Sequence, residues 1–73
     1  MKRRPRTYDY RYIRSYYGVD PIVGARVTVE GKPGTIVRED PGQGNHLMVR
    51  FDGDKHAMPC HPTWEVDYLA VVP

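Results

Sequence analysis

From residue 24 onward, apolar and polar side chains alternate in short runs, which is the pattern of strands that bury one face. The runs predict five short strands, at residues 25–31, 35–38, 46–51, 55–59 and 65–72. Glycine and proline separate the runs, and they predict tight turns at 31–34 (GKPG) and at Asp52–Gly53. Because strands this short do not cover a core as an open sheet, we expect them to curl into a small barrel.

The same alternation predicts which side chains form the core. The inward positions are Val27, Val29, Ile36, Leu47, Val49 and Phe51. Met48 falls on the outward face of its strand. In the corner before the last strand, Pro62 suits the first position of a single helical turn, and His61 or Thr63 is placed to bond its free backbone N–H groups. We expect Trp64, in the same corner, to fill one end of the barrel.

Tyrosines dominate the segment that precedes the barrel. They recur every four residues, as on one helix face, at Tyr8, Tyr12 and Tyr16. Tyrosines in this segment also alternate as in a strand, but Gly18 followed by Pro21 is a typical helix end, so we predict a short helix over about residues 8–17. The face with the four-residue spacing is expected to pack on the barrel, which leaves Tyr10 and Tyr17 exposed.

These elements divide one domain into a flexible basic arm at 1–7, a short helix at 8–18 and an SH3-like β-barrel at 22–73. The predicted fold is therefore mainly β, a small five-stranded SH3-like barrel with a short N-terminal α-helix. A five-stranded OB barrel is the alternative, although its strands are usually longer. One cysteine excludes an internal disulfide, and the chain has neither a signal-peptide pattern nor an apolar run that would span a bilayer. We expect a cytoplasmic protein with no membrane partner.

Charge is distributed unevenly along the chain, and this distribution indicates what kind of partner the chain binds. Residues 1–17 hold six basic residues against one acidic residue, a net charge of +5, whereas residues 18–73 hold five against eight, a net charge of −3. A basic head on an acidic body is typical of an arm for nucleic acid or another acidic partner. Arginines beside tyrosines suit phosphate contacts combined with base stacking. The alternative is a solvated tail that only aids solubility.

The segment 60–64 invites a chemical interpretation, because it combines the only cysteine and the only tryptophan of the chain with a histidine. A structural zinc site needs four ligands, and the candidates are His46, His56, Cys60 and His61. Adjacent residues of an extended chain point to opposite faces, and a cysteine nucleophile needs a base in contact and a cleft. We therefore interpret Cys60 as a half-buried apolar residue, and we predict no catalytic residue, metal, cofactor or small-molecule substrate.

Two strings of the sequence resemble known modules. VGARVTVEGKPGTIV…HLMVRFDG resembles the opening of SH3-like modules of the KOW, Tudor and CAP-Gly kind. The longer string YYGV…GTIV…VRFDG…HPTWEVDYL is similar to small uncharacterised proteins of bacteriophages and prophages. The resemblance implies an SH3-like barrel and a phage protein, but no activity. The aromatic cage of Tudor domains and the glycine-rich string of the CAP-Gly groove have no counterpart here.

Together these observations predict a non-enzymatic binding module that engages nucleic acid through the arm and the helix, mainly at phosphates and with weak sequence selectivity. The expected contact residues are Lys2, Arg3, Arg4, Arg6, Tyr10, Arg11, Arg14, Tyr17 and Lys32. The alternative is a protein–protein interaction module, or a phage-encoded inhibitor or adaptor, that binds a host or phage protein through the helix rich in Tyr and Arg.

Overall fold

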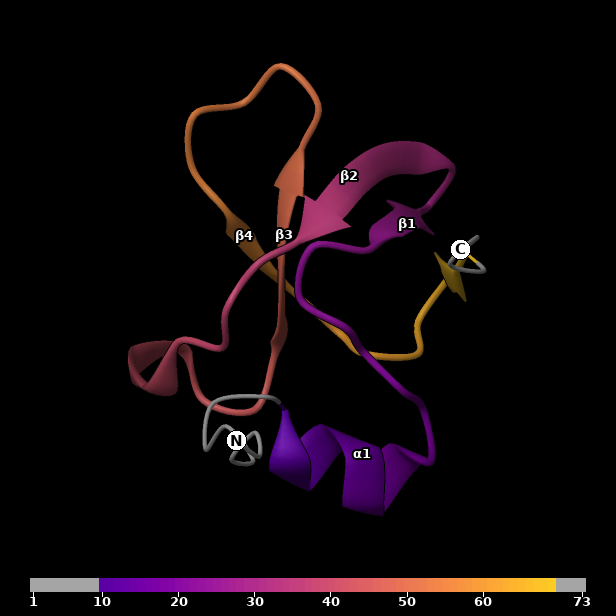
Figure 1. The fold of residues 1–73 in the computed structure, drawn as a ribbon, viewed down its shortest axis with the longest axis vertical. Coiled ribbons are helices and arrows are strands. Elements are labelled where there is room, and N and C mark those ends of the chain that lie inside the picture. The colour runs from indigo at the N-terminus through magenta and orange to yellow at the C-terminus, as the bar shows by residue number, and fades with distance from the viewer. Residues whose placement is uncertain (1–9, 70–73) are drawn as a thin grey trace, which may run out of the picture.

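One short helix and five strands form the fold in the computed structural model, which describes residues 10–69 (Figure 1). The elements are α1 (Arg11–Tyr17), β1 (Arg26–Val29), β2 (Lys32–Ile36), the 3-10 turn η1 (Pro41–Gln43), β3 (Leu47–Phe51), β4 (Met58–Cys60) and β5 (Val66–Tyr68). The predicted arm at 1–7, the start of the predicted helix with Tyr8 and the end of the predicted last strand lie outside the described residues. Within residues 10–69, no helix combines the length and the apolar character needed to cross a bilayer.

The strands form one antiparallel sheet in the order β4-β3-β2-β1-β5. The sheet curls into a half-barrel, with α1 at one end and the β1–β2 turn and β3–β4 loop away from it (Figure 1). The last strand returns to pair with the first, and Val27 lies opposite Tyr68. The predicted mainly β fold, a small SH3-like barrel with an N-terminal helix, is thereby confirmed. The strands are three to five residues long, shorter than the alternative OB barrel usually has.

The first hairpin turn lies two positions earlier than the sequence predicts. Val29 pairs with Lys32, so the turn consists of Glu30 and Gly31 alone. Both have positive φ, 52° and 80°, as a two-residue type I′ turn requires. The sequence did not reveal this turn because glutamate, unlike Asn, Asp or Gly, is uncommon in the left-handed conformation. Of the residues expected to form the turn, 31–34, only Gly31 does so, and 32–34 belong to β2 instead.

The second hairpin is longer than predicted. Asp52–Gly53 does form a turn, but the β3–β4 ladder begins only at the pair Val49 and Met58. A type I′ turn needs positive φ at both central residues, and only Gly53 has it, at 90°. The chain therefore loops out before it pairs, and β4 occupies Met58–Cys60 rather than the predicted 55–59.

The core consists largely of the side chains that the alternation predicts. The buried hydrophobic residues are Tyr10, Ile13, Val27, Val29, Ile36, Leu47, Met48 and Val49. Two predictions about the faces of β3 need correction, because Met48 is buried and Phe51 is only half-buried against the core. The strand carries buried residues on both faces at its first three positions, and the backbone N–H of Met48 donates to the Tyr10 hydroxyl.

Tyr10 is the main departure from the predicted core. It was expected to be exposed, but it has no exposed surface, and its left-handed backbone (φ 59°) immediately precedes the helix. Its hydroxyl donates to the Val37 carbonyl oxygen (2.5 Å) and accepts from the Met48 N–H (3.1 Å). Its own backbone N–H donates to a carboxylate oxygen of Glu39 (3.0 Å). Tyr10 therefore fastens the start of α1 to the sheet, and it does not belong to a binding surface.

Candidate nucleic-acid interface

The outward face of α1 carries two stacked tyrosine rings. Tyr12 and Tyr16 are 46% and 67% exposed, their ring centroids are 5.4 Å apart, and their planes differ by 10°. Four-residue spacing places the two side chains next to each other on a helix surface. The sequence predicted that this pair packs on the barrel, and that prediction is wrong. The inward position belongs to Ile13, which is 1% exposed.

A signal for this orientation was present in the sequence. Ile13 and Tyr17 form a second pair with four-residue spacing, beside the tyrosine pair. Ile13 is the only aliphatic residue in the helix, and it therefore gains most from burial. If Ile13 is placed inward, in preference to the more numerous tyrosines, the predicted inner and outer faces of α1 agree with the observed ones.

Tyr17 was predicted to be exposed, and it is half-buried against the core. Its ring meets Tyr16 edge-on at a centroid distance of 4.8 Å and His61 at 5.5 Å. Edge-to-face packing of this kind stabilises aromatic neighbours. Of these two rings, Tyr16 is therefore the more exposed.

The two helix arginines differ in their surroundings. Arg11 is exposed in the first turn of α1. Arg14 forms an ion pair with Asp20, and its guanidinium also donates to the Pro21 carbonyl oxygen (2.5 Å). Arg14 thus ties the helix to the segment that follows it, and Arg11 is the other basic residue of α1.

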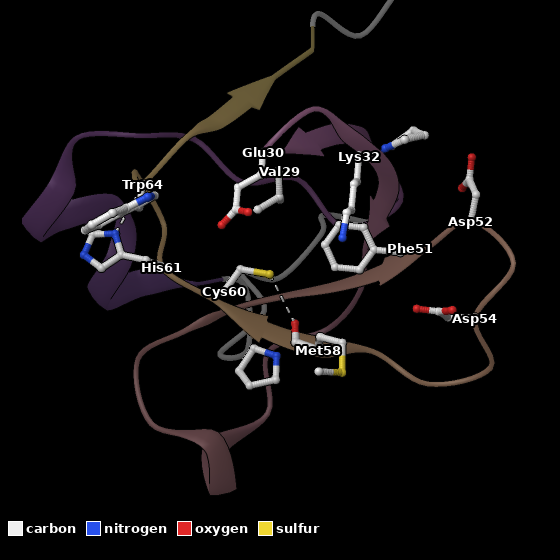
Figure 2. A pocket seen from close by; sticks show the side chains of 12 residues that line it. Val29, Glu30, Lys32, Phe51, Asp52, Asp54, Met58, Cys60, His61 and Trp64 are labelled. Atoms are coloured by element: carbon white, nitrogen blue, oxygen red, sulfur yellow. Dashed lines mark hydrogen bonds between the residues drawn. The ribbon is translucent and has the colours of Figure 1, made fainter.

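Lys32, another predicted contact residue, is not brought to this surface. Lys32 begins β2, at the end of the molecule away from α1, where its neighbours include Glu30 and Asp54 (Figures 1 and 2). The four basic residues of the predicted arm, Lys2, Arg3, Arg4 and Arg6, lie outside the described residues. Among the described residues, the candidate interface therefore consists of Arg11, Tyr12 and Tyr16.

The corner at 60–64 is structural in its observed contacts. The Nδ1 atom of His61 accepts from the backbone N–H groups of Thr63 (3.1 Å) and Trp64 (3.2 Å), which confirms the predicted cap. The capped segment is a turn rather than a helical turn. Pro62 is buried, and its carbonyl oxygen accepts from the Tyr68 hydroxyl (2.6 Å). Trp64 does not fill the barrel end as predicted, because 65% of it is exposed.

Cys60 has the half-buried environment that the sequence predicts. Its Sγ lies 3.6 Å from the Met58 carbonyl oxygen, and burial, with a smaller effect of the Glu30 charge, raises the pKa of its thiol. A raised pKa keeps the thiol protonated at neutral pH, whereas the nucleophilic form of cysteine is the thiolate. Within residues 10–69, no three histidine, cysteine or acidic side chains gather in a group that would hold a metal ion.

No protein-family model, no curated protein and no solved structure matched this chain in the three comparisons. The resemblance to small phage proteins therefore stays a prediction.

Proposed function

We propose that this protein is a non-enzymatic binding module that binds nucleic acid through α1 and the basic segment 1–7. The observation that carries the proposal is the stacked, exposed pair of Tyr12 and Tyr16 on the helix that follows the basic segment. Exposed aromatic rings next to arginines provide a platform for bases and a charge for phosphates.

The geometry favours single-stranded nucleic acid over a duplex. A tyrosine platform binds a base by its π-face, and such a face is accessible only where bases are unstacked. Stacking contributes about 1–3 kcal/mol per base and depends little on sequence. Arg11 and the four basic residues of segment 1–7 add phosphate contacts, so affinity is expected to fall with salt, with a slope of about −0.7 per contacted phosphate on single strands.

A titration of fluorescein-labelled oligothymidylate with the full chain tests the proposal by fluorescence anisotropy. The double variant Tyr12→Ala, Tyr16→Ala is expected to weaken binding about tenfold or more, because one to two base platforms are lost. Leu69→Ala, which removes another exposed apolar side chain (43% exposed), is the matched control and leaves the affinity unchanged. Equal affinity of the double variant and the wild-type chain contradicts the proposal.

Salt dependence gives a second readout of the same interface. Arg11→Gln is expected to reduce the slope of log affinity against log salt by about 0.7, the contribution of one phosphate contact on a single strand. Lys55→Gln removes an equal charge from the exposed β3–β4 loop and serves as its control. Absence of any binding at about 50 mM salt rules out the nucleic-acid proposal.

The same tyrosine pair supports a protein partner as the second candidate. Tyr and Arg are enriched at interface hot spots, and Tyr12 and Tyr16 together present a wide aromatic surface. If the chain does not bind oligothymidylate or RNA at low salt, and if it captures a protein partner that the double variant no longer captures, then it is a protein–protein interaction module.

A further inference from the structure

A groove on the half-barrel lies apart from the tyrosine face of α1. It has a volume of ≈ 790 Å³ and lies between the β1–β2 turn, the end of β3, β4 and the corner at 61–64 (Figure 2). None of the residues that line it belongs to α1. We propose that this groove binds a short peptide segment of another protein, in which arginine lies beside apolar side chains.

Apolar side chains that the core leaves uncovered form the floor and one end of the groove. Met58 is 50% exposed and Trp64 is 65% exposed, and both line it, together with the half-buried ring of Phe51. Figure 2 shows Trp64 at one end and Phe51 at the other, with Cys60 between them. A concave surface with clustered apolar and aromatic side chains is the usual form of a binding site, because an incoming apolar group removes both surfaces from water.

The charges of the groove select the partner. Three carboxylates line it, from Glu30, Asp52 and Asp54, against one cation, Lys32, so the lining carries a net charge of −2. Asp52 is engaged by Arg26, whose guanidinium bonds both carboxylate oxygens (2.9 and 2.7 Å). That hydrogen bond lowers the pKa of Asp52 and keeps it ionised.

Glu30 and Asp54 have no such counterpart. Both are exposed, and within residues 10–69 neither side chain forms an ion pair or a hydrogen bond. The negative charge of Glu30 reaches the groove interior, where it contributes to the raised pKa of the Cys60 thiol. An arginine is the complementary group, because its guanidinium pairs with carboxylates and also stacks on an aromatic face such as that of Trp64.

The same charges argue against nucleic acid in this groove. A phosphate backbone is repelled by the unpaired carboxylates of Glu30 and Asp54, whereas a basic and apolar peptide matches both the charge and the exposed side chains of the groove. The inference is therefore independent of the proposed function of α1, and each can fail without the other.

Trp64 provides a direct reporter, because it is the only tryptophan of the chain and lines the groove. The full chain is titrated with a short peptide in which arginine alternates with leucine, and with the same peptide carrying glutamate in place of arginine; neither contains tryptophan. The arginine peptide is expected to shift the Trp64 emission to shorter wavelength in a saturable way, and the glutamate peptide to leave it unchanged. Equal responses to both peptides, or no response to either, overturn the proposal.

Variants that conserve side-chain size locate the effect. Glu30→Gln combined with Asp54→Asn is expected to weaken binding of the arginine peptide about tenfold, since a hydrogen bond to a charged group is lost. Asp67→Asn, which removes an exposed carboxylate of β5 outside the groove, leaves the affinity unchanged. If Asp67→Asn weakens binding equally, the effect comes from the overall charge of the protein, and the proposed site in the groove is contradicted.

Backbone amide shifts of the isotope-labelled full chain separate the remaining outcomes. Shifts at Glu30, Met58 and Trp64 on addition of the arginine peptide support the groove, whereas shifts confined to Tyr12 and Tyr16 overturn it. If the chain self-associates without peptide and the groove variant abolishes this, the occupant is the basic segment of a second copy, and the proposal of another protein is wrong. The variant Tyr12→Ala, Tyr16→Ala retains peptide binding whether or not it still binds nucleic acid.

Discussion

At the scale of single residues, two aromatic side chains have the opposite exposure to the one that the sequence predicts: Tyr10 is buried and Trp64 is exposed. Tyr10 is fully buried because its hydroxyl reaches the Val37 carbonyl and the Met48 N–H, which satisfies the only polar group that a buried tyrosine brings into the core. Trp64 is mostly exposed because the turn before β5 is held by His61, Pro62 and Tyr68 instead. A large apolar residue in a corner is therefore no proof of a core position.

The exposure of Trp64 leads to a prediction opposite to the one that the sequence suggests. Trp64→Ala is expected to lower the free energy of unfolding by less than about 1 kcal/mol, because mostly exposed side chains contribute little. Leu47→Ala, at a fully buried position, is expected to lower it by about 2–5 kcal/mol. Urea unfolding followed by far-ultraviolet circular dichroism compares the two. A loss at Trp64 equal to that at Leu47 contradicts the observed exposure.

At the scale of elements, the contact between β2 and β3 depends on a close approach of the two backbones. Gly34 lies opposite Phe51 in the ladder and is buried. A Cβ at Gly34 would lie 2.6 Å from the Val49 Cγ1 atom and 3.0 Å from the Arg50 carbonyl oxygen. The side chain of Val49 can shift, but the carbonyl oxygen is part of the sheet. The residue read from the sequence as a turn glycine is in fact a packing glycine.

Gly34→Ala is accordingly expected to lower the free energy of unfolding by about 1–3 kcal/mol, the usual cost of an overpacked core. Gly42→Ala is the matched control, because the nearest atom to its added Cβ is 3.4 Å away, in the exposed η1 turn. Thermal or urea unfolding of both variants provides the comparison. Equal stability of the two variants would mean that β2 and β3 can move apart at Gly34 without a loss of folding free energy.

At the scale of the whole molecule, the described surface separates two kinds of chemistry. The tyrosine pair and Arg11 lie on α1, while the carboxylates of Glu30 and Asp54 line the groove at the other elements. Two tyrosine hydroxyls connect separate parts of the fold: Tyr10 joins the start of α1 to β3, 38 residues away, and Tyr68 joins β5 to the nearby corner at Pro62. The stability of the molecule is therefore coupled to the protonation of these two phenols.

Burial, as the largest cause in each case, raises the pKa of Tyr10 and of Tyr68 from 10.0 to about 12. A pKa raised on folding means that the folded state favours the neutral phenol. The stability that these groups contribute is therefore present below pH 10 and is lost as the pH rises from 10 to 12. Tyr68→Phe is expected to flatten this decline, and Tyr12→Phe, at an exposed ring, to leave it unchanged. Urea unfolding across this pH range measures the decline in stability. A decline in Tyr68→Phe as steep as in the wild-type chain contradicts the prediction.

Much of the core was predictable from local pattern, and the candidate site was not. Strict alternation identified Val27, Val29 and Val49 as inward, because strand period links sequence spacing directly to side-chain direction. The faces of α1 were misassigned because the helix has only seven residues, too few for periodicity to separate the two possible faces. The left-handed backbone at Tyr10, which starts the helix at residue 11, has no signature in the residue type itself.

The sequence by itself determined the fold class, the five strands and the glycine that caps α1, and it limited the cap of the corner before β5 to His61 or Thr63, because each depends on residues within a few positions of one another. The tertiary structure decided where the aromatic residues lie. Tyr10 is buried by partners 27 and 38 residues away, and Tyr12 and Tyr16 become a surface only because Ile13 takes the inward position. The corner that looked chemical in the sequence is a capped turn, and its exposed Trp64 lines a groove assembled from distant segments.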